Sequence, residues 1–383
     1  MTLHFSEAEL ADRRQRVCAS MARDGLDGML IFRQESMHYL TGYDTFGFVF
    51  FQCLYLGQDG RMTLLTRSAD RLQAALTSMI EDVRIWVDHP DASPAGELKA
   101  ILEEYRLHGK RLGVEWEAYG LTARNGQRLS LALDGFCDLA DASDLVSHIR
   151  VIKSPAEIEY VRKAGNLADD AYDAAVELTE PGAFEGKILS AMQGAIFEGG
   201  GDYPGNEFIV GSGEKALLCR YYSGRRNLDT NDQLTLEWAG AYRHYHAAMM
   251  RTFITGTPDP QHVSMHSAAA DALEAVKEKV APGHTLGDAF QAHCRVLDGL
   301  GMGDHKLNAC GYSLGTTFAP NWMDWPMMYA DNPVEFQPGM VIFCHMIIMN
   351  GKDKLAMSLG ETVLVTESSH ERLSSAPLSL VVK

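Results

Sequence analysis

Over the first part of the chain, hydrophobic and polar positions follow helical spacing in some stretches and form short apolar runs in others. In residues 6–24, Leu10, Val17 and Met21 recur near helical spacing, which predicts an amphipathic helix. Residues 37–48 are expected to form a turn-rich aromatic segment. Further helical stretches are expected near residues 69–80, 94–107 and 120–131. Helices that alternate with short apolar strands are typical of an α/β domain.

The segment RVIKSPAEIEYVRKAG has the features of a helix start. Ser154 can cap the helix, Pro155 suits its first position, and Glu157 completes a capping box. We expect this helix to run to about Leu178 and a second helix to span residues 184–198.

Residues 231–256 form the clearest pattern of the second part, with two apolar strands around a tight polar turn. Helical stretches follow near residues 261–280 and 286–300, and strands and loops make up the remainder. We therefore expect an α+β fold with a mainly antiparallel sheet. We assign residues 1–150 to an N-terminal domain and residues 151–383 to a catalytic domain.

The hairpin also holds the strongest candidates for chemistry. Glu237 lies inside an apolar strand, and His244, His246 and Arg251 follow the turn. An acid in such a strand is costly to bury unless it is paired, hydrogen-bonded or functional. The nearby cationic side chains favour a functional role, and the alternative is a structural ion pair with Arg251 or Arg220.

Composition narrows the choice of partners and compartment. The 383 residues are 46% hydrophobic and 22% charged, an ordinary globular composition with room for two domains. A formal charge of -17 argues against nucleic-acid binding and against adhesion to anionic membranes. The seven cysteines form no CxxC pair, which favours reduced thiols in a cytoplasmic protein. Because the N-terminus has no apolar signal-peptide core, a soluble protein is expected.

Five segments in order resemble the landmarks of the pita-bread hydrolases, the family of prolidase, aminopeptidase P, methionine aminopeptidase and creatinase. These segments are RVIKSPAEIEYVRKAG, YHAAMMRTF, CGYSLG, QPGMVIF and ETVLVTE. MHYLTGY is similar to a segment in the N-terminal domain of the creatinase and prolidase branch. The resemblance implies an α/β N-terminal domain and an α+β pita-bread catalytic domain, usually in a homodimer.

The family peptidases hold two divalent metals with two Asp, one His and two Glu side chains. The corresponding positions carry Glu237, Ala248, Tyr312, His345 and Gly360 in this chain. Since only Glu237 keeps a carboxylate at its own position, the resemblance implies that no metal and no other cofactor is used. Creatinase and bacterial ectoine hydrolase are metal-free members of the same branch, and the pattern E-x-A-G-x-Y-R-x-Y-H followed by R-T is similar to ectoine hydrolase.

Four residues are candidates for catalysis. Glu237 can act as a nucleophile or as a general base. His345 replaces a metal ligand, and either His345 or His246 can move protons, because an ordinary histidine titrates near neutral pH. Tyr312 can donate a hydrogen bond to a developing oxyanion. The alternative for each histidine is a structural role in its strand.

Five further residues are candidates for substrate binding. Arg220 stands where creatinase keeps a histidine, and Arg220 or Arg251 can grip a substrate carboxylate. Trp322 and Trp325 can stack on a planar or cationic group, although packing within their loop is the alternative. Glu361 occupies the position next to Gly360 and is expected to face the other side of its strand.

The sequence thus predicts a metal-independent hydrolase that acts on a C–N bond of a small polar compound. The bond is that of an amide, an amidine or a guanidino group, and the compound carries a carboxylate. A divergent Xaa-Pro peptidase that recruits metal through Glu237, His345 and Glu361 is the second hypothesis. A non-catalytic binding protein on the same scaffold is the third.

Overall fold

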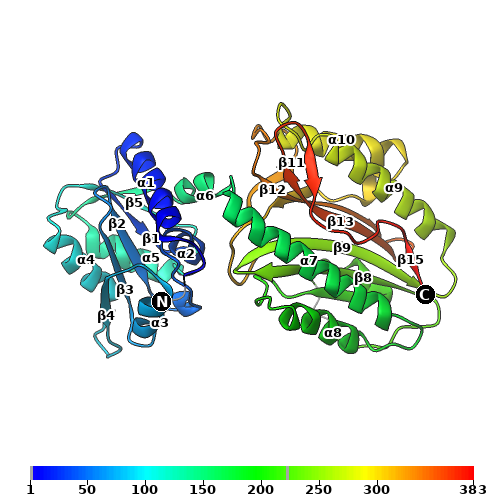
Figure 1. Ribbon diagram of the computed structural model, residues 1–383, viewed down its shortest axis with the longest axis horizontal. Coiled ribbons are helices and arrows are strands. Elements are labelled where there is room, and N and C mark those ends of the chain that lie inside the picture. Colours follow the sequence, from blue (N-terminus) through cyan, green and yellow to red (C-terminus); the bar gives the residue numbers. More distant parts are fainter. Residues whose placement is uncertain (1–2, 221–223) are drawn as a thin grey trace. The chain divides into compact units, whose positions relative to one another are not determined.

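The computed structural model describes residues 3–220 and 224–383, and the chain divides into two compact units, Met1–Arg150 and Val151–Lys383 (Figure 1). Each unit has its own sheet and its own apolar cores. Within the described residues, no helix is long and apolar enough to cross a membrane.

A six-stranded mixed sheet in the order β4-β3-β2-β1-β5-β6 forms the centre of the first unit. Its strands are β1 (Gly28–Ile31), β2 (Cys53–Gly57), β3 (Met62–Arg67), β4 (Asp82–Trp86), β5 (Arg111–Val114) and β6 (Asp138–Asp141). Its helices are α1 (Glu7–Arg23), α2 (Gln34–Thr41), the 3-10 helix η1 (Gly47–Val49), α3 (Asp70–Thr77), α4 (Pro94–Glu104), α5 (Ala123–Leu133) and α6 (Leu145–Arg150).

Helices pack against the sheet of this unit in two separate apolar clusters. One cluster includes Leu102 of α4 and Leu129 of α5, and the other includes Val17 of α1, Met37 of α2 and Val146 of α6. This arrangement confirms the predicted α/β architecture.

The prediction of a turn-rich segment for residues 37–48 was wrong at its beginning, because α2 extends to Thr41. The helix ends at Gly42, whose φ of 82° suits glycine. All side chains from Ser36 to Thr41 are buried. The segment therefore lacks the polar stripe from which a helical period is recognised.

A buried carboxyl group directly after β5 holds the segment that leads into α2. The Glu115 carboxylate accepts hydrogen bonds from the backbone N–H groups of Phe32 (3.0 Å) and Arg33 (2.8 Å) and from the Ser36 hydroxyl (2.6 Å). Burial raises the pKa of Glu115 to about 7, although these three bonds favour the charged form.

Glu115→Gln is expected to weaken the pH dependence of folding stability. A carboxyl whose folded-state pKa is raised stabilises the fold fully below its unfolded pKa near 4.5, and this contribution is lost as the pH rises through about 7. Glutamine keeps an acceptor for the backbone and a donor for Ser36, but it does not ionise. The free energy of unfolding is measured in urea at pH 5 and at pH 8. The difference between variant and wild type should change by about 1–3 kcal/mol in favour of the variant from pH 5 to pH 8.

Glu117→Gln is the matched control, because the Glu117 side chain is 75% exposed. If Glu115→Gln and wild type differed by the same free energy at both pH values, the buried carboxyl would not be the titrating group.

A nine-stranded sheet forms the centre of the second unit, with the main order β11-β10-β12-β13-β9-β8-β7. Its strands are β7 (Ile209–Ser212), β8 (Asp232–Tyr242), β9 (Tyr245–Thr255), β10 (Ala309–Ser313), β11 (Asp324–Tyr329), β12 (Val341–Asn350), β13 (Leu355–Val365), β14 (His370–Arg372) and β15 (Val381–Val382). Strands β14 and β15 pair with β13 and β9, and only the β15–β9 pair is parallel among the described strands of this unit.

The helices of this unit are α7 (Pro155–Leu178), α8 (Glu185–Glu198), α9 (Pro260–Lys277), α10 (Leu286–Gly299) and the 3-10 helices η2 (Gly213–Leu217) and η3 (Gly303–His305). The predicted capping box of α7 is confirmed. The Ser154 hydroxyl accepts from the Glu157 N–H (3.3 Å), and the Glu157 carboxylate accepts from the Ser154 N–H (2.9 Å).

Long helices cover one face of the second sheet, as Figure 1 shows for α7 and α9. The indole N–H of Trp238 in β8 donates to the Ala168 carbonyl of α7 (2.9 Å). A Cβ at Gly240 would lie 2.0 Å from the Ala164 carbonyl oxygen, so the close approach of α7 to β8 requires glycine. The α+β architecture predicted for the second domain is confirmed.

Candidate active site

A single row of residues crosses four neighbouring strands of the second sheet. Glu237 of β8 pairs with Met250 of β9, Met250 with Gly360 of β13, and Gly360 with His345 of β12. Residues in register project on the same side of a sheet. Since Trp238 contacts α7, its neighbour Glu237 projects from the opposite face, and His345 projects with it.

A cavity of about 390 Å³ lies on this face. Five of the predicted site residues line it, namely Arg220, Glu237, Tyr312, Trp322 and His345. Three asparagines and several apolar side chains complete the wall. The structure therefore brings together residues that are far apart in the sequence, and the volume suits a small-molecule ligand.

Glu237 is the carboxylate of this cavity among the described residues. Burial raises the pKa of Glu237 to about 7. The positive charge of Arg220 and a hydrogen bond from the Tyr312 hydroxyl oppose this rise. A carboxyl group held in this way exchanges a proton near neutral pH, which suits a catalytic base or nucleophile.

Tyr312 is oriented by a second aromatic side chain. The indole N–H of Trp322 donates to the Tyr312 hydroxyl oxygen (2.9 Å). Because that oxygen accepts from Trp322, the hydroxyl proton of Tyr312 is directed to Glu237, its other partner. Burial raises the pKa of Tyr312 well above its ordinary value, so the hydroxyl stays protonated.

A bulge in β10 turns the Tyr312 ring into the cavity. The register against β11 shifts between Ala309 and Tyr312, and both residues line the cavity. The bulge contains Gly311 at a φ of 158°, and a Cβ there would lie 2.3 Å from the Phe343 carbonyl oxygen. Glycine is required at this position because no side chain fits.

Three aromatic rings pack together where the family peptidases are expected to hold metal. The ring centroids of Tyr312, Phe343 and His345 lie 5.4 to 5.5 Å from one another. A Cβ at Gly360 would lie 3.0 Å from the Phe343 ring, so that ring covers the glycine. Glu237, Tyr312 and His345 supply one carboxylate, one phenol and one imidazole to the cavity, and this set does not fit a two-metal centre built on carboxylates. Within the described ranges, no group of three His, Cys, Asp or Glu side chains is placed to hold a metal ion.

His345 lies at the cavity wall as a neutral ring. Burial, together with the nearby His293, lowers the pKa of His345 to about 3. In the described part of the chain, its Nδ1 has no hydrogen-bond partner. The predicted role as a carrier of protons is therefore disfavoured, because the ring holds no additional proton at neutral pH. A neutral imidazole can still donate one hydrogen bond to a ligand.

His246 does not line the cavity, contrary to its predicted catalytic role. Its Nε2 accepts from the Gly205 N–H (2.9 Å), and its Nδ1 lies 3.1 Å from the Thr317 hydroxyl oxygen. Both ring nitrogens are engaged in the fold, so His246 cannot exchange a proton with a ligand while these contacts persist.

Arg251 is also misassigned as a substrate-binding residue. It follows Met250, so its side chain leaves the sheet on the face away from Glu237. Its guanidinium donates to the carbonyl oxygens of Met250 (2.9 Å), Gly360 (2.6 Å) and Pro377 (3.2 Å). These contacts give Arg251 a structural role.

Glu361 and Trp325 lie outside the cavity lining as well. Glu361 is fully buried and accepts from the Lys277 ammonium (2.8 Å) and from the Arg372 guanidinium. Trp325 packs against the apolar cluster that includes Leu273 of α9. Neither residue binds substrate in this arrangement, and the predicted metal set with Glu361 is not assembled.

Sequence reasoning missed Phe343, which packs against Tyr312 and His345, and several residues of the cavity wall. Phe343 stands two residues before His345, and the two-residue period of a strand would have placed both on one face. The remaining missed residues lie in the cavity wall, and the sequence carried no comparable signal for them. They include Asn206, Cys219, Asn308, Asn321, Met323, Met327 and Tyr329.

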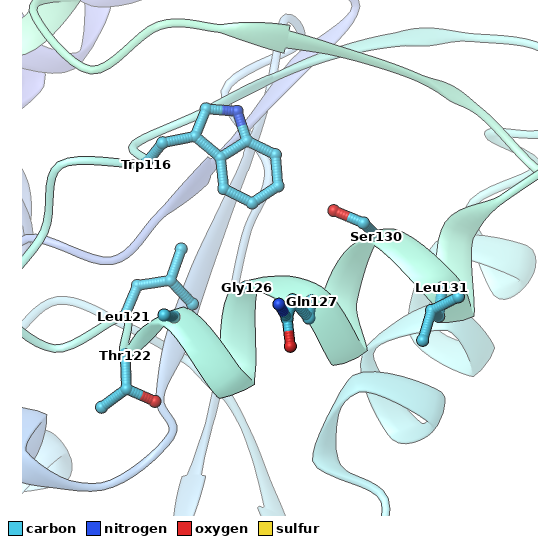
Figure 2. A pocket seen from close by; sticks show the side chains of 8 residues that line it. Trp116, Leu121, Thr122, Gly126, Gln127, Ser130 and Leu131 are labelled. Atoms are coloured by element: carbon cyan, nitrogen blue, oxygen red, sulfur yellow. The ribbon is translucent and has the colours of Figure 1, made fainter.

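A second hollow, of about 560 Å³, lies beside α5 in the first unit (Figure 2). Figure 2 shows the Trp116 indole next to α5, the helix that carries Gly126 and Gln127. Among the described residues, its lining contains no acid, histidine, lysine or arginine. It therefore lacks the groups that hydrolysis requires, and the cavity around Glu237 is the candidate active site.

Known proteins resemble this chain in both parts. The family model of metallopeptidase family M24 matches residues 159–367, and that of the creatinase/prolidase N-terminal domain matches residues 13–152. An ectoine hydrolase from Halomonas elongata is 30% identical over 100% of this chain and 99% of its own length. An Xaa-Pro dipeptidase from Pyrococcus horikoshii is 21% identical over 97% of this chain and 99% of its own length.

Among solved structures, an X-Pro aminopeptidase from Thermotoga maritima superposes with a TM-score of 0.85 at 20% identity. The superposition covers 97% of this chain and 99% of that one. This likeness establishes the fold and confirms the predicted pita-bread architecture.

Proposed function

The chain belongs to metallopeptidase family M24, and from this premise we propose that it hydrolyses a C–N bond of a small carboxylate-bearing compound through Glu237, without a catalytic metal. Its named relatives, an ectoine hydrolase and an Xaa-Pro dipeptidase, are both hydrolases. The finer assignment rests on one observation. Glu237 lines a small cavity, with its pKa raised to about 7 and Tyr312 hydrogen-bonded to it.

Glu237 can cleave the bond by either of two routes. In the first, it takes a proton from water while the water oxygen bonds to the carbon of the C–N bond, and it then returns the proton to the leaving nitrogen. In the second, a carboxylate oxygen bonds to that carbon and the nitrogen leaves with a proton from water; the hydroxide that remains then cleaves the covalent intermediate and restores the carboxylate. Both routes require the ionised carboxylate, and neither requires a metal.

Tyr312 and His345 supply hydrogen bonds at the reacting centre. As Glu237 loses its negative charge, the Tyr312 hydroxyl can donate instead to the negative charge that develops on the substrate. His345 lines the same cavity as a neutral donor. Their buried, fixed positions support a stabilising role, because such donors need little rearrangement during the reaction.

Arg220 and the cavity size support a small substrate with a carboxylate. Arg220 is exposed at the cavity, and its charge reaches Glu237. An arginine so placed can hold a substrate carboxylate with two parallel hydrogen bonds. The opposite end of the substrate, an amidine or amide, then lies at Glu237. Ectoine, a cyclic amidine with a carboxylate, has both features and is the first compound to test.

The experiment is a product analysis by mass spectrometry. Purified protein is incubated with ectoine, with creatine and with an Xaa-Pro dipeptide, with and without added manganese. Without added metal, we expect products whose summed mass is that of a carboxylate-bearing amidine or amide plus one water. Cleavage of the dipeptide only with manganese would favour the metal-dependent peptidase. Tight binding of ectoine without any product would favour a non-catalytic binding protein.

The Xaa-Pro dipeptidase relatives and the family itself favour metal-dependent peptide hydrolysis as the second candidate. The side chains at the site oppose it. Glu361, one of the three ligands that this hypothesis requires, is bound to Lys277 and Arg372 on the other side of the sheet.

A further inference from the structure

His246 lies at the end of the β8–β9 hairpin, next to the turn. It pairs with Ala241, whereas Glu237 pairs with Met250 further along the same two strands. The turn is formed by Arg243 and His244, whose positive φ values of 53° and 64° are those of a tight hairpin turn. His246 is fully buried, and its hydrogen bonds leave the hairpin for two other segments of the chain.

These two segments form part of the cavity wall. Gly205, which donates to His246 Nε2, directly precedes Asn206, a cavity residue. A Cβ at Gly205 would lie 2.9 Å from the Asn321 carbonyl oxygen and 3.2 Å from the backbone nitrogen of Trp322. The segment at Gly205 therefore packs directly on the segment that carries Trp322.

A chain of hydrogen bonds connects His246 with the second segment. Since Nε2 accepts from Gly205, the proton of the neutral ring lies on Nδ1, where the Thr317 hydroxyl oxygen (3.1 Å) is the nearer acceptor and the Gly315 carbonyl oxygen (3.4 Å) of the same segment is the second. That hydroxyl donates in turn to the Trp322 carbonyl oxygen (3.4 Å). The indole of Trp322 donates to Tyr312, which donates to Glu237.

We propose that His246 is a positioning residue of the active site. It fixes the segments at Gly205 and Thr317 so that the Trp322 indole holds the Tyr312 hydroxyl on Glu237. The proposal rests on the proposed function for its catalytic consequence, but the structural part stands without it. Burial lowers the pKa of His246 to about 4, which keeps the ring in the form with one donor and one acceptor.

The first test is the pH dependence of kcat/KM with the substrate identified above. The ionisable groups that line the cavity with Glu237 are Cys219, Arg220, Tyr312, Tyr329 and His345. Because the Tyr312 hydrogen bond lowers the pKa of Glu237, a displaced Tyr312 should raise it. We expect His246→Leu to move the midpoint near pH 7 upward by about 0.5–1 pH unit and to lower kcat/KM about tenfold.

Matched variants separate positioning from a general loss of stability. His246→Gln keeps an acceptor for Gly205. Its midpoint should therefore lie at least halfway back from the His246→Leu value to the wild-type value. Thr317→Val breaks the same chain one step later and should resemble His246→Leu. His266→Leu removes a half-buried histidine of α9, whose Nε2 lies 2.9 Å from the Leu378 carbonyl oxygen, and should leave the midpoint unchanged. Equal midpoints in wild type, His246→Leu and Thr317→Val would overturn the proposal.

The second test needs no substrate. The chain has five tryptophans, and their indole N–H signals can be resolved by NMR of protein labelled with ¹⁵N-tryptophan. Trp322→Phe assigns the signal of Trp322. We expect this signal to shift or broaden in His246→Leu and in Thr317→Val and to recover in His246→Gln. An unchanged Trp322 signal in the two folded variants would overturn the proposal, whereas failure of every substrate would overturn only the proposed function.

Discussion

Replacement of Glu237 by glutamine is expected to lower kcat at least about a thousandfold while the protein stays folded. Glutamine has nearly the same shape and can still accept the Tyr312 hydrogen bond, but it neither takes a proton from water nor attacks carbon. The measurement is steady-state hydrolysis of the substrate at pH 8, with urea unfolding as the check on folding. Glu207→Gln is the matched control, because Glu207 is exposed beside the cavity residue Asn206.

The pH dependence of kcat/KM in the wild-type enzyme is a second test of Glu237 as the reacting group. Because the reactive form is the carboxylate and burial raises its pKa to about 7, kcat/KM should rise with pH through about 7 and then level off. A Glu237→Gln variant with more than about a tenth of the wild-type rate would remove Glu237 from the mechanism.

Replacement of Tyr312 by phenylalanine is expected to lower kcat by about a hundredfold. The ring and its packing against Phe343 and His345 remain, but the hydroxyl that donates to Glu237 is lost, and the indole N–H of Trp322 loses its acceptor. Since that hydroxyl also lowers the pKa of Glu237, the midpoint of the pH profile should move to higher pH. Rates measured from pH 5 to 9 test both effects.

Tyr203→Phe is the control for the loss of a tyrosine hydroxyl, because the Tyr203 side chain is 80% exposed. A Tyr312→Phe enzyme with the wild-type rate and an unchanged midpoint would show that the phenol only fills space.

Local signals in the sequence were sufficient for much of the fold. The capping box at Ser154 and Glu157 fixed the start of α7, because this signal is confined to four neighbouring residues. The acid in an apolar strand identified Glu237, since its cost of burial does not depend on the rest of the fold. The helix α2 was not predicted, because Ser36 to Thr41 are all buried and the segment has no polar stripe at helical spacing.

The errors at the site come from contacts between distant segments. Arg251 and His246 are close to Glu237 in sequence, but strand alternation turns Arg251 to the other face, and hydrogen bonds to Gly205 and Thr317 hold His246 in the fold. A tight turn fixes the register of a hairpin, so the orientation of Arg251 could have been predicted. The partners of His246 could not, because they lie about 40 and 70 residues away.

The central claim is that Glu237 acts without a metal, and hydrolysis by metal-depleted protein tests it most directly. The protein is dialysed against a strong chelator, its residual manganese, zinc, cobalt and iron are measured by elemental analysis, and its rate on the substrate is compared with that of untreated protein. We predict the full rate with far less than one metal ion per chain. Loss of activity on depletion, with recovery on addition of a divalent metal, would contradict the claim.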